Sequence, residues 1–204
     1  MAGDQVNNSG NFDGDIKYLD GFKYLDKNIP IFAIHGNHEY GVSDGASFYD
    51  PNYRLPYLAD QTKIKMEQLG ITYLVNELKT LKINDQAFNL FGGDEFWAQK
   101  LDLSVLRKRS NNLPTIALIH NPSAIFDVAG NQVDLMLSGH THGGQIRLPF
   151  IGPLIKVSSD IPRAWHQGWV YYKDVKMFVT SGVGETGVRA RLFTPPEIVL
   201  LTIR

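Results

Sequence analysis

Residues 135–149 read LMLSGHTHGGQIRLP and decide how the rest of the chain is interpreted. An apolar run ends at Ser138-Gly139 and is followed at once by two histidines, His140 and His142. Imidazole is a metal ligand, and the flanking glycines let the backbone turn close to a bound group. In open α/β sheets, ligand sites lie just beyond the carboxyl ends of the strands. The stretch therefore predicts a buried strand that ends in a ligand site.

The composition restricts both the class of protein and the kind of metal site. With 204 residues, 43% hydrophobic and 20% charged, the chain fits one globular domain over residues 1–204. A net charge of -1 gives no reason to expect a nucleic acid partner. The absence of cysteine excludes disulfides and thiolate ligands, so His, Asp, Glu or Asn would hold a metal. With no apolar run near the ~20 residues that span a bilayer and no signal peptide, we expect a cytoplasmic or membrane-associated chain.

Apolar spacing predicts alternating helices and strands on both sides of residues 135–149. Helices are expected over 15–27, 60–69, 103–109 and 123–128. Strands are expected over 31–34, 71–76, 80–83, 87–91, 115–119, 133–137, 169–172, 177–180 and 198–203. Helices that lead into buried strands imply a parallel or mixed sheet with helices on its faces, and residues 40–60 are expected to form a long loop over the site.

Metal-capable side chains stand at four strand ends, three of them after predicted strands and the fourth, at Asp4, with almost no strand before it. They are Asp4, the run Asn37-His38-Glu39, His120, and the pair His140 and His142. Hydrolysis with two metal ions requires such a set, because a carboxylate bridges the ions and neutral N or O ligands complete each shell. Ligands without sulfur suit Mn, Fe, Zn or Mg.

The order of these motifs resembles that of the calcineurin-like metallophosphoesterases. The matching motifs are Gly3-Asp4, Gly36-Asn37-His38-Glu39, His120 and Gly139-His140-Thr141-His142. The segments Gly143-Gly144-Gln145 and Pro195-Pro196-Glu197-Ile198 are similar to the branch typified by YkuE and YaeI, which includes UDP-2,3-diacylglucosamine pyrophosphatase-like enzymes. The resemblance covers nearly the whole chain and implies an α/β fold, a β-sandwich of mixed sheets flanked by helices.

The resemblance also implies roles for these residues. Asp4 would bridge two divalent ions; Asn37, His120 and His140 would complete one ion, and His142 would serve the other. The catalytic residues would be His38, beside the leaving-group oxygen, and Glu39, next to it. The chain would be a metallophosphoesterase in which a metal-activated hydroxide cleaves a phosphoester or pyrophosphate bond. A small-molecule or lipid-linked substrate, manganese and a place in lipid A biosynthesis are further expectations.

The resemblance departs at the start of the chain. The family's first motif, Asp-x-His, should precede Gly3-Asp4 and is absent from this sequence. The ion of His142 would keep only Asp4 and His142, so we expect an N-terminally incomplete domain, marginally stable, with about one tightly bound ion. Three alternatives stay open: a truncated or mis-started enzyme, an enzyme with one metal, or a chain without catalysis that acts as a binding scaffold.

Other residues have weaker signals and competing structural explanations. Arg147, Arg189 and Arg191 could bind substrate phosphate, although exposed arginines are usually solvated. Phe150 to Ile155 could form a peripheral membrane contact, and the Trp165/Trp169 region favours core packing. Taken alone, Gly139 to His142 could be a glycine-rich turn, Asn37 a helix cap and His120 a core histidine. We expect His35 and His166 to be structural.

Overall fold

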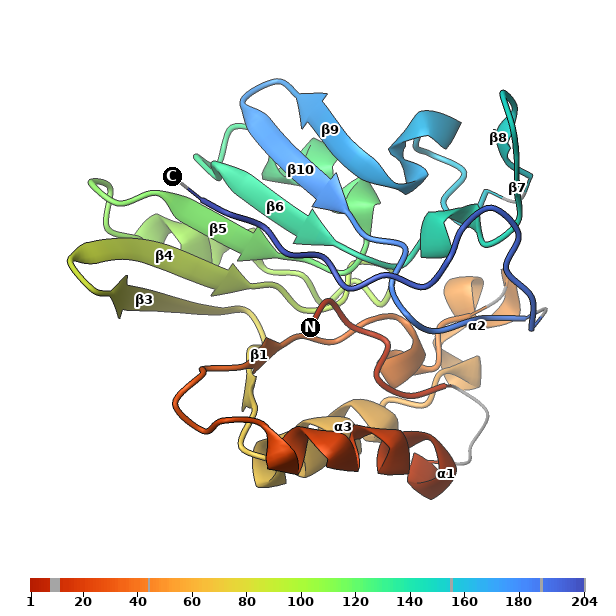
Figure 1. Ribbon diagram of the computed structural model, residues 1–204, viewed down its shortest axis with the longest axis horizontal. Helices are drawn as coiled ribbons and strands as arrows, with labels where there is room; N and C mark the ends of the chain where they lie inside the picture. The colour runs from red at the N-terminus through yellow and green to blue at the C-terminus, as the bar shows by residue number, and fades with distance from the viewer. Residues whose placement is uncertain (8–11, 44, 155, 188, 204) are drawn as a thin grey trace.

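The centre of the fold is a mixed sheet of six strands (Figure 1). The computed structural model describes residues 1–7, 12–43, 45–154, 156–187 and 189–203. Across the sheet, the strands are β3 (Glu77–Ile83), β4 (Gln86–Gly92), β5 (Thr115–Leu118), β6 (Leu135–Ser138), β10 (Val175–Val179) and β9 (Gly168–Tyr172). The inner four strands run parallel, whereas β3 and β9 are antiparallel to their neighbours. The carboxyl ends of the parallel strands therefore meet at one edge.

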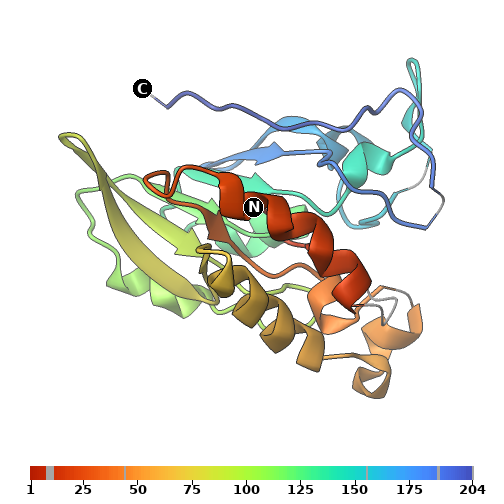
Figure 2. The same ribbon diagram turned by 60° about the horizontal axis from the view of Figure 1, so that its bottom comes forward.

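A second, smaller sheet covers one face of the first. It pairs β1 (Phe32–Ala33) with β2 (Thr72–Tyr73) in parallel. Ile34 and Leu74, which follow these strands, pack with Leu90 and Leu118 of the large sheet. On its other side lie the helices α1 (Phe12–Ile16) and α3 (Tyr57–Gln68) and the 3-10 helix η1 (Lys17–Tyr24), as Figure 2 shows.

The opposite face of the large sheet carries the main core. Because side chains alternate across a strand, Phe91, Ala117 and Met136 point to this face while their neighbours in sequence point to the small sheet. Leu106 and Ile125 cover them. These two residues belong to the 3-10 helix η4 (Leu103–Lys108) and the helix α4 (Ile125–Val128), which follows the 3-10 turn η5 (Pro122–Ala124). The order of layers is helix, small sheet, large sheet, helix.

Short elements surround the edge where the parallel strands end. They are the 3-10 turns η2 (His38–Tyr40), η3 (Pro51–Tyr53), η6 (His142–Gly144) and η7 (Arg163–His166), the helix α2 (Gly45–Tyr49), and the hairpin of β7 (Arg147–Leu148) and β8 (Gly152–Pro153). The loop expected over residues 40–60 thus contains α2, η3 and the start of α3. The Asp50 carboxylate accepts the Asn52 N–H, and proline occupies the first position of η3, so helical structure begins here. The loop-like composition of the segment did not indicate it.

The strand predicted over residues 198–203 is wrong. These residues have no strand assignment, and Ile198 and Leu200 are 92% and 93% exposed. In the view of Figure 1 the segment passes in front of the large sheet as an extended chain. An alternating apolar pattern becomes a strand only when a neighbouring strand accepts its backbone hydrogen bonds, and the pattern cannot report whether that neighbour is present.

The predicted fold class is confirmed. The chain has a mixed α/β fold in which a central mixed sheet is flanked by helices. Two predicted helices differ in kind: residues 103–109 form 3-10 helix, and residues 15–27 begin as α1 and continue as η1.

Candidate metal centre

Three of the predicted ligands lie on loops that leave the same edge of the two sheets. Asn37 follows β1, His120 follows β5 and His140 follows β6. The Gly139 N–H donates to the carbonyl of His120 over 3.0 Å, which holds the last two loops together. Adjacent parallel strands deliver successive loop residues to one place, so residues distant in sequence meet there.

Four side chains converge at this edge. His120 Nε2 lies 3.1 Å from Asp4 Oδ2 and 3.1 Å from Asn37 Oδ1. His140 Nδ1 lies 2.8 Å from the same Asn37 oxygen and 3.3 Å from His120 Nε2. The ligand atoms of Asp4, His120 and His140 all lie within 4.8 Å of one another.

Backbone groups turn two of these side chains toward the cluster. The second ring nitrogen of His120, Nδ1, contacts the Ala2 carbonyl over 2.5 Å. The amide N–H of Asn37 donates to the Val42 carbonyl over 2.5 Å, which leaves its oxygen facing the two imidazoles. Partners of this kind fix the orientation of metal ligands. For a histidine they also determine which ring nitrogen is left to bind the metal.

The chemistry of the donor set fits a divalent metal ion. Asp4 offers a carboxylate oxygen, Asn37 an amide oxygen, and His120 and His140 one imidazole nitrogen each. These are the N and O ligands that Mn, Fe and Zn accept in proteins. Together they could hold one ion.

The charges in the cluster depend strongly on Asp4. Burial lowers the pKa of His120, but the Asp4 carboxylate more than offsets this and raises it to about 9. Burial, with His120 next to it, holds the pKa of His140 well below its usual range. Burial alone would raise the pKa of Asp4, yet His120 and His38 keep it well below its usual range. Asp4 is therefore ionised, as a metal ligand requires.

Glu39 joins the backbone turns of Asp4 and Gly36. Its carboxylate is fully buried and accepts four backbone N–H groups. The donors are Asp4 at 3.0 Å, Gln5 at 2.5 Å, Val6 at 3.2 Å and Gly36 at 2.6 Å. Burial, followed by Asp4, raises the pKa of Glu39, which His35 and the Gly36 N–H oppose. Glu39 therefore joins two backbone segments, and its catalytic role stays a prediction.

The Glu39 carboxylate brings the Asp4 turn against the Gly36 turn. Asp4 has a φ of 55°, a strained conformation for a residue other than glycine. A Cβ added to Gly36 would overlap the Asp4 carboxylate oxygen Oδ1. Only glycine at position 36 leaves room for this ligand, a packing constraint that sequence spacing cannot reveal.

The other predicted residues of the active site lie around the cluster. His38 is half-buried, and its backbone N–H donates to Asp4 Oδ1 over 3.0 Å. His142 is not part of the three-residue group; its Nδ1 faces the Gly184 carbonyl at 3.2 Å. Thr141, between the two histidines, donates to the His166 carbonyl over 2.7 Å and holds this turn in place.

The three predicted phosphate-binding arginines differ in exposure and contacts. The Arg191 guanidinium donates to several backbone carbonyls, including Ser181 at 2.8 Å and Thr194 at 3.2 Å. Arg147 donates to the Gly143 carbonyl over 3.0 Å, and Arg189 is exposed. Arg191 therefore supports the backbone beside η6.

Sequence reasoning missed two features next to the cluster. The ring of Trp97 meets that of His140 edge-on, with centroids 4.3 Å apart. The buried Glu95 accepts the Ala98 N–H, and burial raises its pKa to about 7. An acidic pair followed by two aromatics, Asp94 to Trp97, was the available signal. His35 and His166 are buried and bonded to protein groups, His35 to Asp94 at 3.0 Å and His166 to the Pro162 carbonyl at 3.2 Å.

Comparison with known proteins places this geometry in a family. The family model described as calcineurin-like phosphoesterase matches residues 1–144. The metallophosphoesterases YkoQ and YkuE of Bacillus subtilis are 26% and 28% identical over 97% and 100% of this chain. The phosphodiesterase YaeI of Escherichia coli is 29% identical over 85% of it. The chain spans 69%, 66% and 58% of the lengths of these three relatives.

One solved structure with a similar fold is sulfate thiohydrolase SoxB of Thermus thermophilus. It matches 87% of this chain and 32% of its own, with a TM-score of 0.50 and 11% sequence identity. At that identity the likeness concerns the fold alone. Because the family match covers most of the chain, including Asp4, Asn37, His120 and His140, the chain belongs to the calcineurin-like phosphoesterase family, whose members are hydrolases acting on phosphoesters.

Proposed function

We propose that this chain hydrolyses a phosphoester bond, most readily in a phosphodiester, at the cluster of Asp4, Asn37, His120 and His140. The observation that carries the proposal is the convergence of one carboxylate oxygen, one amide oxygen and two imidazole nitrogens. The name phosphodiesterase given to YaeI supports the diester substrate.

Each residue of the cluster has a role that follows from its contacts. A bound divalent ion, manganese in our proposal, would supply Lewis-acid chemistry that polarises a phosphoryl oxygen and makes water nucleophilic near neutral pH. Asp4, held by the His38 N–H, supplies the negative charge of the site. His38 gives a proton to the leaving oxygen as the ester P–O bond breaks and water forms the new one. His142 extends the ligand set toward a second ion.

Assays on three substrates test the proposal. Purified protein with Mn²⁺ is given bis(4-nitrophenyl) phosphate, 4-nitrophenyl phosphate and UDP-2,3-diacylglucosamine, which separates diester, monoester and lipid-linked pyrophosphate hydrolysis. We expect turnover of the diester, lost in His120→Ala and Asn37→Ala and kept in Glu67→Gln, whose carboxylate pairs with Lys63 on the surface. Folded, metal-loaded protein without turnover of any substrate would favour the binding scaffold.

We also propose a peripheral membrane contact through the β7–β8 hairpin. Phe150, at its tip, is fully exposed, as are large parts of Ile151 and Leu154, whereas Ile155 lies outside the described residues. Among the described helices, none combines the length and the apolar character that crossing a membrane requires. Co-sedimentation with anionic liposomes should fall in Phe150→Ser, and wild-type protein that stays in the supernatant contradicts the proposal.

A further inference from the structure

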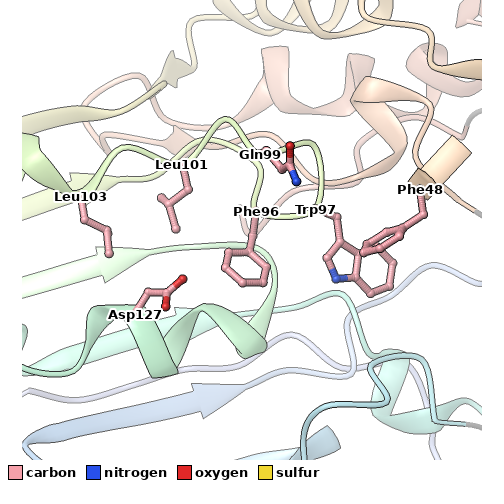
Figure 3. Close-up of a pocket in the computed structure, with 7 residues that line it drawn as sticks. All are labelled: Phe48, Phe96, Trp97, Gln99, Leu101, Leu103 and Asp127. Atoms are coloured by element: carbon pink, nitrogen blue, oxygen red, sulfur yellow. The ribbon is translucent and has the colours of Figure 1, made fainter. Parts of the chain in front are cut away.

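An apolar groove lies beside the candidate metal centre. Two adjoining cavities, of about 430 and 510 Å³, share Phe48, Phe96 and Trp97 as walls. Figure 3 shows these three rings, with Leu101 and Leu103 continuing the first cavity away from Trp97. We call the two cavities together the aromatic groove.

The aromatic groove reaches the cluster through two of its own residues. Trp97 places its ring against that of His140, with centroids 4.3 Å apart, and Phe48 meets Trp97 edge-on at 5.5 Å. Val42 lines the second cavity, and its carbonyl accepts the Asn37 amide. A molecule bound at the cluster therefore has the groove within reach.

The groove is held open by polar contacts behind its walls. Arg54 donates to the carbonyls of Ser47 at 2.9 Å and Phe48 at 3.0 Å on α2, and to that of Ala98 at 3.3 Å on the opposite wall. The guanidinium thus joins both walls from behind. A preformed groove does not have to be ordered when a ligand binds, which favours affinity.

The charges of the groove disfavour an anionic group beside a phosphate that is bound at the cluster. Among the described residues that line the groove there is no lysine or arginine, and the charged ones are Asp127 and Asp160. Asp160 accepts the Ser123 hydroxyl over 2.9 Å. Carboxylates repel a phosphate, whereas aromatic and leucine side chains favour an uncharged apolar group.

From these observations we propose that the aromatic groove binds an uncharged apolar group, aryl or alkyl, that stays esterified to the phosphate when the other ester bond breaks, which makes phosphodiesters carrying such a group the preferred substrates. The inference rests on the proposed function, since it takes the phosphate to lie at the cluster. Aryl and alkyl groups share the required apolar surface, and the experiment distinguishes them.

The chain's three tryptophans allow a binding test that needs no turnover. Protein labelled with 5-fluorotryptophan gives one fluorine resonance for each tryptophan, and Trp97→Phe assigns the one in the groove. In Mg²⁺, diphenyl phosphate and dihexyl phosphate serve as aryl and alkyl probes, with inorganic phosphate as the control. We expect the Trp97 resonance to shift with at least one diester while those of Trp165 and Trp169 stay fixed. The tighter diester identifies the group.

Three outcomes overturn the inference. They are no shift of the Trp97 resonance with either diester, equal shifts of all three resonances, and an equal Trp97 shift with inorganic phosphate. Each of these can be observed whether or not the protein is active, so failure of this inference is distinguishable from failure of the proposed function.

A kinetic test uses two phenylalanines of equal exposure. Phe48, in the groove, is 39% exposed, and Phe126, which contacts Trp165 and Tyr172 instead, is 38% exposed. Phe48→Ala should raise KM for bis(4-nitrophenyl) phosphate by up to about tenfold, the upper end of the range for one aromatic contact, and leave KM for 4-nitrophenyl phosphate, whose single aryl group is the leaving group, unchanged. Phe126→Ala should change neither. If Phe48→Ala affects both substrates equally while turnover persists, the groove inference fails and the proposed function stands.

Discussion

Two buried glutamates support opposite sides of the candidate site, and their surroundings differ. Glu39, on the side of Asp4, accepts four backbone N–H groups. Glu95, on the side of the aromatic groove, accepts one backbone N–H, from Ala98, and its buried Oε1 has no hydrogen-bond partner among the described residues. Both side chains are 0% exposed. A buried glutamate thus makes four hydrogen bonds where it supports the turn of the ligand Asp4, and one where it lies behind the wall of the aromatic groove.

The same substitution, Glu to Gln, should have different effects at the two positions. In the wild type, the backbone N–H groups donate to the Glu39 carboxylate. Glu39→Gln replaces one carboxylate oxygen with an amide NH₂, which cannot accept from them. We expect a loss of about 3 kcal/mol or more in the free energy of unfolding, measured by urea denaturation, because buried donors lose their partners. Glu67→Gln on the surface should change it by less than about 1 kcal/mol. A loss that small for Glu39→Gln would show that the four contacts do not stabilise the fold.

Glu95→Gln should instead remove a pH dependence. Burial raises the pKa of Glu95 from 4.5 to about 7, so the folded chain binds more protons than the unfolded chain between these values. The free energy of unfolding therefore falls as pH rises through this window, by about 3 kcal/mol at 1.36 kcal/mol per unit. Urea denaturation at pH 4.5 and pH 8 should give a smaller fall in Glu95→Gln. Equal falls in both proteins would contradict the raised pKa.

Gly36→Ala tests the position of Asp4 without replacing any metal ligand. The new Cβ overlaps Asp4 Oδ1, so the carboxylate must move. We expect Mn²⁺ affinity, measured by calorimetry, to fall 10- to 100-fold, the usual effect of disturbing a residue behind a ligand. Gly21→Ala, where the new Cβ meets nothing within 4 Å, is the control. Unchanged affinity in Gly36→Ala would mean that Asp4 is not held where the metal binds.

Thr141→Val should have the smallest effect. The Thr141 hydroxyl donates to the His166 carbonyl over 2.7 Å inside the turn between His140 and His142. Its loss should cost about 1 kcal/mol in thermal or urea unfolding while Trp97 and the groove are unaffected. A change in the Trp97 fluorine resonance of this variant would show that the two sides are coupled.

The sequence predicted those parts of the site that depend on strand ends. Apolar runs locate the carboxyl ends of parallel strands, so Asn37, His120 and His140 could be expected at one edge. The positions of Glu39 and Trp97 could not be predicted, because their partners are backbone amides and a ring brought near by folding. The prediction of a strand over residues 198–203 was wrong for the same reason, because a strand forms only where folding brings a neighbouring strand to pair with it.

The long sequence separation of the site contacts has a consequence for how the chain folds. His120 meets Ala2 across 118 residues, and His140 meets Asn37 across 103. Such contacts close large loops and therefore form only after most of the sheet has been assembled. A metal ion that binds all four ligands stabilises the native state and not a partly folded one. Metal binding during refolding would thus report the last step of folding, when the N-terminal segment has met the loops that follow β5 and β6.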